Sequence, residues 1–160
     1  MRAIATIGTG IMALVFLASM VNATGGHTSA EGYWQTIDDK TGEIKSIVKV
    51  WVDDKNTLNG RIVKIFPKPG EDPDPVCDKC KGRLKDRKII GMVFMWGFHR
   101  EGDKWVAGEI VDPENGKQYH CQVYTRNQGK ELKVYGYIKF IVKIGRTQTW
   151  IRTDQAALEG

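Results

Sequence analysis

The stretch that decides the fold is Lys88–Arg100, which reads Lys-Ile-Ile-Gly-Met-Val-Phe-Met-Trp-Gly-Phe-His-Arg. Its two glycines weaken a helix, whereas its β-branched and aromatic residues favour a strand, and the lack of charge between its cationic ends predicts burial on both faces. Because side chains in a strand alternate between two faces, one face is expected to carry Ile89, Val93 and Met95. The other face is large, soft and aromatic: Ile90, Met92, Phe94, Trp96 and Phe98. Such a row suits the inside of a small barrel, either as a filling or as the lining of a cavity.

The composition is that of one globular domain. The chain has 160 residues, 41% of them hydrophobic and 27% charged, and its net charge is only +5, which does not name a partner. Cations crowd the segment 79–88, where a solvated face that keeps the protein soluble is one interpretation. The other is contact with phosphate or carboxylate groups of the cell envelope, through Lys79, Lys81, Arg83 and Lys85. No aromatic residues interleave with these cations, so nucleic acid is not an expected partner.

Residues 1–23 have the features of a secretory signal peptide. A short basic start is followed by an apolar run over 4–21 and by small or short side chains at Val21-Asn22-Ala23, where signal peptidase cleaves. An uncleaved membrane anchor is the alternative, which the short run and its glycines and threonines disfavour. We therefore expect an exported protein, in the periplasm or secreted, that is soluble after cleavage and has no transmembrane segment. Residues 24–30 are expected to form a flexible tail.

From residue 31 to residue 153, alternating segments between turn signals predict about eight strands and no amphipathic helix. The expected strands span 32–37, 43–52, 58–66, 88–100, 105–111, 117–125, 132–144 with a kink at Gly136, and 146–152 after Gly145. The proline-rich segment 67–75 is incompatible with a helix or a central strand and predicts a long loop across one end. We expect an all-β fold, a single up-and-down antiparallel β-barrel, with a C-terminal tail over 154–160. An open β-sandwich is the alternative.

The first ordered residues, Gly32-Tyr33-Trp34, resemble the Gly-x-Trp opening of the lipocalin-like (calycin) barrels. The resemblance implies that Trp34 plugs the base of the barrel and that a late arginine packs across it, a role for Arg152 or Arg146.

A second resemblance covers nearly all of the chain after the signal peptide. Its motifs are Gly-Tyr-Trp, Pro67-Lys-Pro-Gly-Glu-Asp-Pro-Asp, Cys77-Asp-Lys-Cys80, Gly91-Met, Trp96-Gly97, Asp112-Pro-Glu-Asn-Gly116-Lys-x-Tyr119, Gly136-Tyr and Gly145-Arg-Thr-Gln-Thr-Trp150. In this order they resemble the bacterial family known as domain of unknown function 2147. The resemblance implies an exported lipocalin-like protein and brings no activity with it. One departure is Lys139, where the family pattern has a small residue, often glycine.

Cys77 and Cys80 have the Cys-x-x-Cys spacing of redox sites, half zinc sites and local disulfides. A zinc site needs further ligands, but His120 and Cys121 point to opposite faces of a strand. A redox site needs a helix N-terminus, which the preceding prolines disfavour. In an exported protein a structural disulfide is the default, stabilising by roughly 2 kcal/mol for Cys77–Cys80 and roughly 4 kcal/mol for Cys80–Cys121. We favour the Cys77–Cys80 pair because its members are close in sequence, with Cys121 as a buried thiol.

No pattern of catalytic residues stands out. His27, His99 and His120 lie in no nucleophile or metal motif, and the turn Asp112–Gly116 accounts for its own carboxylates. We therefore expect no enzyme activity, no catalytic residue, no metal and no cofactor; an enzyme that uses His120 is the least favoured alternative.

Two functions remain. The first is an exported lipocalin-like protein that holds a small apolar or amphiphilic ligand in the barrel, in a cavity lined by Met92, Phe94, Trp96, Phe98, Tyr119 and Tyr135. The same residues would equally make a filled core. In that case the alternative is an envelope module that docks on a protein or lipid surface, through the cationic loop and exposed aromatic residues such as Tyr33 and Trp51.

Overall fold

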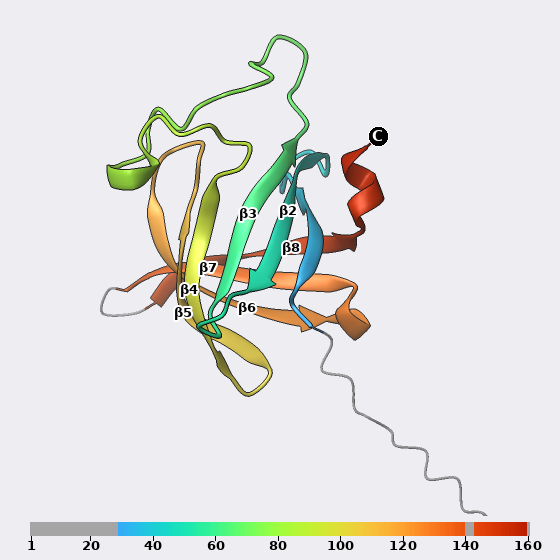
Figure 1. Cartoon of the computed structure of the whole chain (residues 1–160), viewed down its shortest axis with the longest axis vertical. Helices are drawn as coiled ribbons and strands as arrows, with labels where there is room; N and C mark the ends of the chain where they lie inside the picture. The colour runs from blue at the N-terminus through green and yellow to red at the C-terminus, as the bar shows by residue number, and fades with distance from the viewer. Residues whose placement is uncertain (1–28, 140–142, 160) are drawn as a thin grey trace, which may run out of the picture.

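The computed structural model describes residues 29–139 and 143–159, which form a closed barrel of eight antiparallel strands (Figure 1). Each strand pairs with the next one along the chain, and β1 pairs with β8. The strands are β1 (Gly32–Ile37), β2 (Ile44–Val52), β3 (Leu58–Ile65), β4 (Val93–Glu101), β5 (Lys104–Val111), β6 (Gln118–Arg126), β7 (Glu131–Lys139) and β8 (Lys143–Thr153). The predicted up-and-down barrel is confirmed, and the closure excludes an open sandwich.

The barrel closes along a short β1–β8 seam of three residue pairs, with Trp34 opposite Arg152 in its middle. The Arg152 guanidinium lies 4.1 Å from the centre of the Trp34 ring, and it donates hydrogen bonds to the carbonyl oxygens of Ser29, Glu31 and Gly129. Trp34 is fully buried, and its indole nitrogen donates to the carbonyl of Ala30 at 2.9 Å. This is the arrangement that the lipocalin-like resemblance implies. The other candidate, Arg146, instead pairs with Asp39.

Apolar side chains fill the interior. The largest fully buried ones come from most of the strands around the barrel: Trp34, Ile47, Val48, Val50, Leu58, Met95, Phe98, Val123, Leu132 and Trp150. Two glycines make room for the bulkiest contacts, because a Cβ at Gly108 would overlap the Phe98 ring and a Cβ at Gly60 would overlap the Met95 side chain. The core therefore depends on close packing rather than on loosely arranged apolar residues.

Strand β4 begins later than the strand predicted for residues 88–100, and its side chains do not alternate regularly. It begins at Val93, because the preceding residues turn at Gly91 (φ +91°). Its register against β3 shifts twice, between Leu58 and Gly60 and between Gly60 and Arg61, so β4 carries an extra residue at each shift. These bulges break the alternation. Phe94, Met95 and Phe98 are all buried, whereas Trp96 is only partly buried and Ile90 is exposed, so the predicted two faces were wrong in part.

The boundary between β7 and β8 also differs from the prediction. The predicted strand 132–144 ends at Lys139, and β8 already begins at Lys143, so the predicted break at Gly145 was wrong. Gly145 lies inside β8 opposite Tyr137, where a Cβ would overlap the carbonyl oxygen of Gly136. Position 145 requires glycine because two strands approach closely there, and not because the chain turns. Residues 140–142, between the two strands, lie outside the described residues.

At the N-terminal end, the predicted signal peptide and the tail up to residue 28 lie outside the described residues. At the other end, the expected tail contains a 3-10 turn, η3 (Gln155–Leu158), in which the Asp154 side chain accepts a hydrogen bond from the backbone amide of Ala157. Two further 3-10 turns are η1 (Gly82–Leu84) and η2 (Asn127–Gly129). Across 29–139 and 143–159, no helix has the length and apolar character needed to cross a membrane.

Candidate functional site

The long segment between β3 and β4 folds against the β5–β6 hairpin. A disulfide joins Cys77 to Cys80, as predicted, and Cys121 is a buried free thiol. The contact with the hairpin is close, because a Cβ at Gly116 (φ +70°) would overlap the carbonyl group of Lys79. Lys79 also donates from Nζ to the carbonyl oxygen of Glu114 at 3.1 Å. The cross-linked segment with η1 therefore packs closely on the hairpin and is joined to it by the Lys79 side chain.

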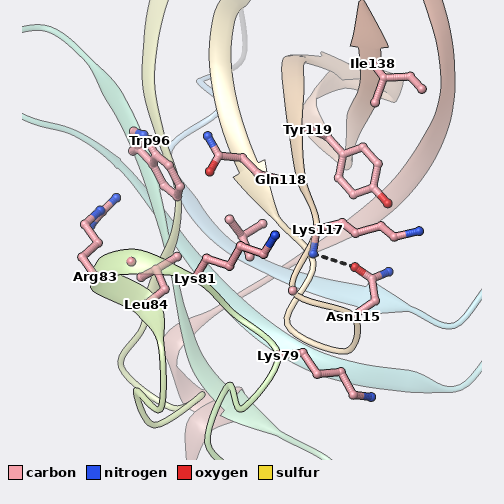
Figure 2. A pocket seen from close by; sticks show the side chains of 13 residues that line it. Lys79, Lys81, Arg83, Leu84, Trp96, Asn115, Lys117, Gln118, Tyr119 and Ile138 are labelled. Carbon is pink, nitrogen blue, oxygen red and sulfur yellow. Dashed lines mark hydrogen bonds between the residues drawn. The ribbon is translucent and has the colours of Figure 1, made fainter.

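A cleft of about 720 Å³ lies between η1, β4 and this hairpin, and the end of β7 borders it on the far side (Figure 2). Its apolar lining comes from five different elements and comprises Leu84, Trp96, Val111, Tyr119 and Ile138. Its polar lining comprises Lys79, Lys81, Arg83, Asn115, Lys117 and Gln118, with Gly82 and Gly116. The cleft thus combines an apolar lining with several cations.

The charges that line the cleft are all positive. No aspartate or glutamate is among its lining residues, whereas four cations are: Lys79, Lys81, Arg83 and Lys117. The Arg83 guanidinium lies 4.4 Å from the centre of the Trp96 ring. Of the carboxylates nearby, Glu114 pairs with Lys45 and Asp74 with Lys88. Asp112 and Glu109 are instead engaged within the hairpin, Asp112 with Asn115 and Glu109 with His120 and Gln118. The cleft therefore offers a positive field that the described ion pairs do not neutralise.

Only three of the four cations predicted to contact anions lie at the cleft. Lys79, Lys81 and Arg83 line the cleft. Lys85 does not; its ammonium group pairs with Asp86 at 3.0 Å and donates to the carbonyl oxygen of Asp78. The Lys85 side chain therefore contacts other residues of the same loop and does not reach the cleft.

The six residues predicted to line a ligand cavity do not lie together. Met92, Phe94 and Phe98 are buried in the core cluster, and only Trp96 and Tyr119 line the cleft. Tyr135 lies on the outer face of β7, next to the buried Val134, and stacks on Tyr137 with ring centres 5.3 Å apart. The bulges of β4 and the position of Tyr135 thus correct the predicted set.

Sequence reasoning missed the contribution of the β5–β6 hairpin and of the end of β7, namely the side chains of Val111, Asn115, Lys117, Gln118 and Ile138. A signal for them was available. In an up-and-down barrel every second connection lies at the same end, so the loop after β3, the β5–β6 turn and the end of β7 are neighbours. What the sequence does not contain is the distance at which the loop packs on the hairpin.

Beside the cleft, Glu109 and His120 pair across β5 and β6. His120 Nδ1 lies 2.8 Å from Glu109 Oε1, and Gln118 Nε2 donates to the other carboxylate oxygen at 3.2 Å. Gln118 is also part of the cleft lining. In the part of the chain that the structure describes, no group of three or more histidine, cysteine, aspartate or glutamate residues could hold a metal ion.

A closed eight-stranded antiparallel barrel with a short sealing seam and an arginine over the first tryptophan is a lipocalin-like barrel. The solved structure of protein HP1028 from Helicobacter pylori, described as belonging to the lipocalin family, matches with a TM-score of 0.66 at 17% identity and covers 82% of this chain and 87% of that one. The family model described as "Uncharacterized protein conserved in bacteria (DUF2147)" matches residues 32–152. The chain belongs to this family, as its motifs indicated. The comparison with curated proteins found no match.

Proposed function

We propose that this protein is an exported, non-catalytic binding protein for a small amphiphilic molecule that carries an anionic group. The observation that carries the proposal is the cleft, whose lining combines apolar side chains and four cations and contains no carboxylate. The lipocalin-like fold supports a binding role, and the Cys77–Cys80 disulfide supports export, since disulfides persist in oxidising compartments.

The cleft, rather than the barrel centre, is the proposed binding place. Phe98 and Met95 already occupy the interior. Each packs so closely on a neighbouring strand that only glycine fits there, at Gly108 for Phe98 and at Gly60 for Met95. The cleft volume of about 720 Å³ falls in the usual range for small-molecule sites, about 300–1,000 Å³. An apolar tail would lie on Trp96 and Tyr119, and the anionic group would meet Lys81 and Lys117. Burial of about 200 Å² of apolar surface would contribute about 5 kcal/mol before ordering costs.

Native mass spectrometry of the protein purified from its own envelope, followed by extraction of any bound molecule, tests the proposal directly. A stoichiometric anionic amphiphile is the expected result. A protein that carries nothing, and that also fails to bind a fluorescent fatty acid, would contradict the proposal.

The place of binding is tested with the same fluorescent fatty acid and its uncharged methyl ester. The double variant Lys81→Glu/Lys117→Glu is expected to bind the acid at least about tenfold more weakly, because two nearby attractions become repulsions, and to bind the ester with little change. The matched control is Lys55→Glu/Lys130→Glu, which alters two exposed lysines outside the cleft lining. Equal weakening by both double variants would place the ligand elsewhere.

A further inference from the structure

A partly exposed tyrosine and two exposed isoleucines border the cleft at the β7–β8 end. Tyr119 and Ile138 line the cleft, and Ile138 pairs with Ile144 of β8. Ile138 is 45% exposed and Ile144 is 60% exposed, the largest value among the exposed large hydrophobic residues of the described chain. We call these three residues, Tyr119, Ile138 and Ile144, the apolar rim. Isoleucine pairs of this exposure at a strand end are not explained by packing within the barrel.

Cations lie beside the apolar rim and at the end of β7. Lys79, Lys81 and Lys117 line the cleft that the rim borders. Lys139 is exposed and follows Ile138 directly, on the opposite face of β7. None of these four lysines takes part in an ion pair among the described residues, whereas Arg146, further along β8, is paired with Asp39. The rim therefore combines apolar groups that can leave water with positive charges that stay at its edge.

From this combination we infer that the apolar rim docks on an anionic phospholipid surface. Exposed isoleucines can enter the boundary between headgroups and acyl chains, while lysines around them meet the lipid phosphates. A protein partner fits less well, because lysine is depleted in protein interfaces and stable interfaces bury a much larger area than two isoleucines and a tyrosine provide. The inference goes beyond ligand binding and does not depend on it. Because Tyr119 and Ile138 belong to both surfaces, a docked protein turns its cleft toward the lipid.

The test is co-sedimentation of the exported protein with vesicles. Two kinds are compared, one of phosphatidylcholine alone and one of phosphatidylcholine with phosphatidylglycerol. Binding is expected only to the anionic vesicles and is expected to fall with added salt. Ile144→Ser removes one apolar contact and is expected to weaken binding about tenfold. Lys139→Ser removes one cation near the surface and is expected to weaken it about fivefold.

The matched control is Ile151→Ser, because Ile151 is an isoleucine of the same strand that is 39% exposed and pairs with Gln35 and Glu131, away from the rim. It is expected to bind like the unaltered protein. Thermal unfolding of each variant, expected to be unchanged at these exposed positions, excludes loss of fold. Absence of binding to anionic vesicles, equal weakening by Ile151→Ser, or a rim that captures an exported protein but no vesicles would each overturn the inference. Ligand occupancy, measured separately, leaves this outcome independent of the proposed function.

Discussion

Arg152 connects three separate parts of the chain. Its guanidinium covers the buried Trp34 ring and donates to carbonyl oxygens before β1 and in the η2 turn. These carbonyls accept hydrogen bonds from a charged donor, which are the stronger kind in proteins. One side chain thus joins the two ends of the folded domain to the β6–β7 connection.

Arg152→Ala is expected to lower the free energy of unfolding by about 3 kcal/mol, because it removes the ring contact and leaves carbonyl groups at the seam without their partner. Urea unfolding followed by tryptophan fluorescence measures this change. The control is Arg146→Ala on the same strand, whose side chain is 70% exposed and whose loss should cost about 0.5 kcal/mol or less. Similar losses for the two variants would show that the seam does not depend on Arg152.

Cys121 makes stability depend on pH in the alkaline range. Burial raises the pKa of its thiol, and the nearby Glu109 carboxylate raises it further. Below the ordinary thiol pKa of 9.0 both the folded and the unfolded chain hold the proton. Above it, only the unfolded chain loses the proton, so stability must fall as the pH rises.

Cys121→Ala isolates this effect, because every other titrating group is shared. The free energy of unfolding of the unaltered protein is expected to fall, relative to the variant, by about 1 kcal/mol per pH unit above 9.0. Urea unfolding on either side of that pH measures the difference. A constant difference across the range would mean that the thiol titrates alike in both states.

At the scale of elements, much of the barrel was predictable and β4 was not. Alternation and turn residues located most strands within a residue or two, since a half-buried strand repeats every second residue. In β4, Gly97 (φ +75°) and a second bulge near Phe94 shift the faces, and neither shift follows from local propensity. The same limit applies to the cleft, because the fit of Gly116 against Lys79 is a tertiary contact.

The packing of β4 on β5 can be tested at Gly108. Gly108→Ala is expected to destabilise the fold by about 3 kcal/mol, because the new Cβ would overlap the buried Phe98 ring. Phe98→Leu alone should also destabilise, through the space that it leaves. Together the two changes are expected to cost clearly less than the sum of the single losses, measured by thermal or urea unfolding. Additive losses would mean that the two residues do not share one packing site.

At the scale of the whole molecule, the cleft exists only where two connections of the barrel meet the end of β7. The disulfide loop supplies Lys81 and Arg83, the β5–β6 hairpin supplies Lys117, and β7 supplies Ile138. None of these elements forms the cleft alone, so its shape depends on the loop staying in place.

Cys77→Ser/Cys80→Ser is expected to lower the free energy of unfolding by about 2 kcal/mol, since the disulfide closes a short loop that the unfolded chain would otherwise leave open. Binding of the fluorescent fatty acid should weaken as well, because the loop loses its cross-link. Urea unfolding and a binding titration measure the two effects. Unchanged stability and binding would show that the packing of the loop on the hairpin and the Lys79 hydrogen bond are sufficient.

The β1–β8 seam sets the order in which this protein can acquire its fold. Tyr33 pairs with Thr153, so the first strand has no partner on one side until almost the whole chain is available. A growing chain therefore presents unpaired strand edges throughout its synthesis. Contacts between such distant positions form late, and a product truncated before β8 would keep β1 and β7 as open edges, ready to pair with other chains.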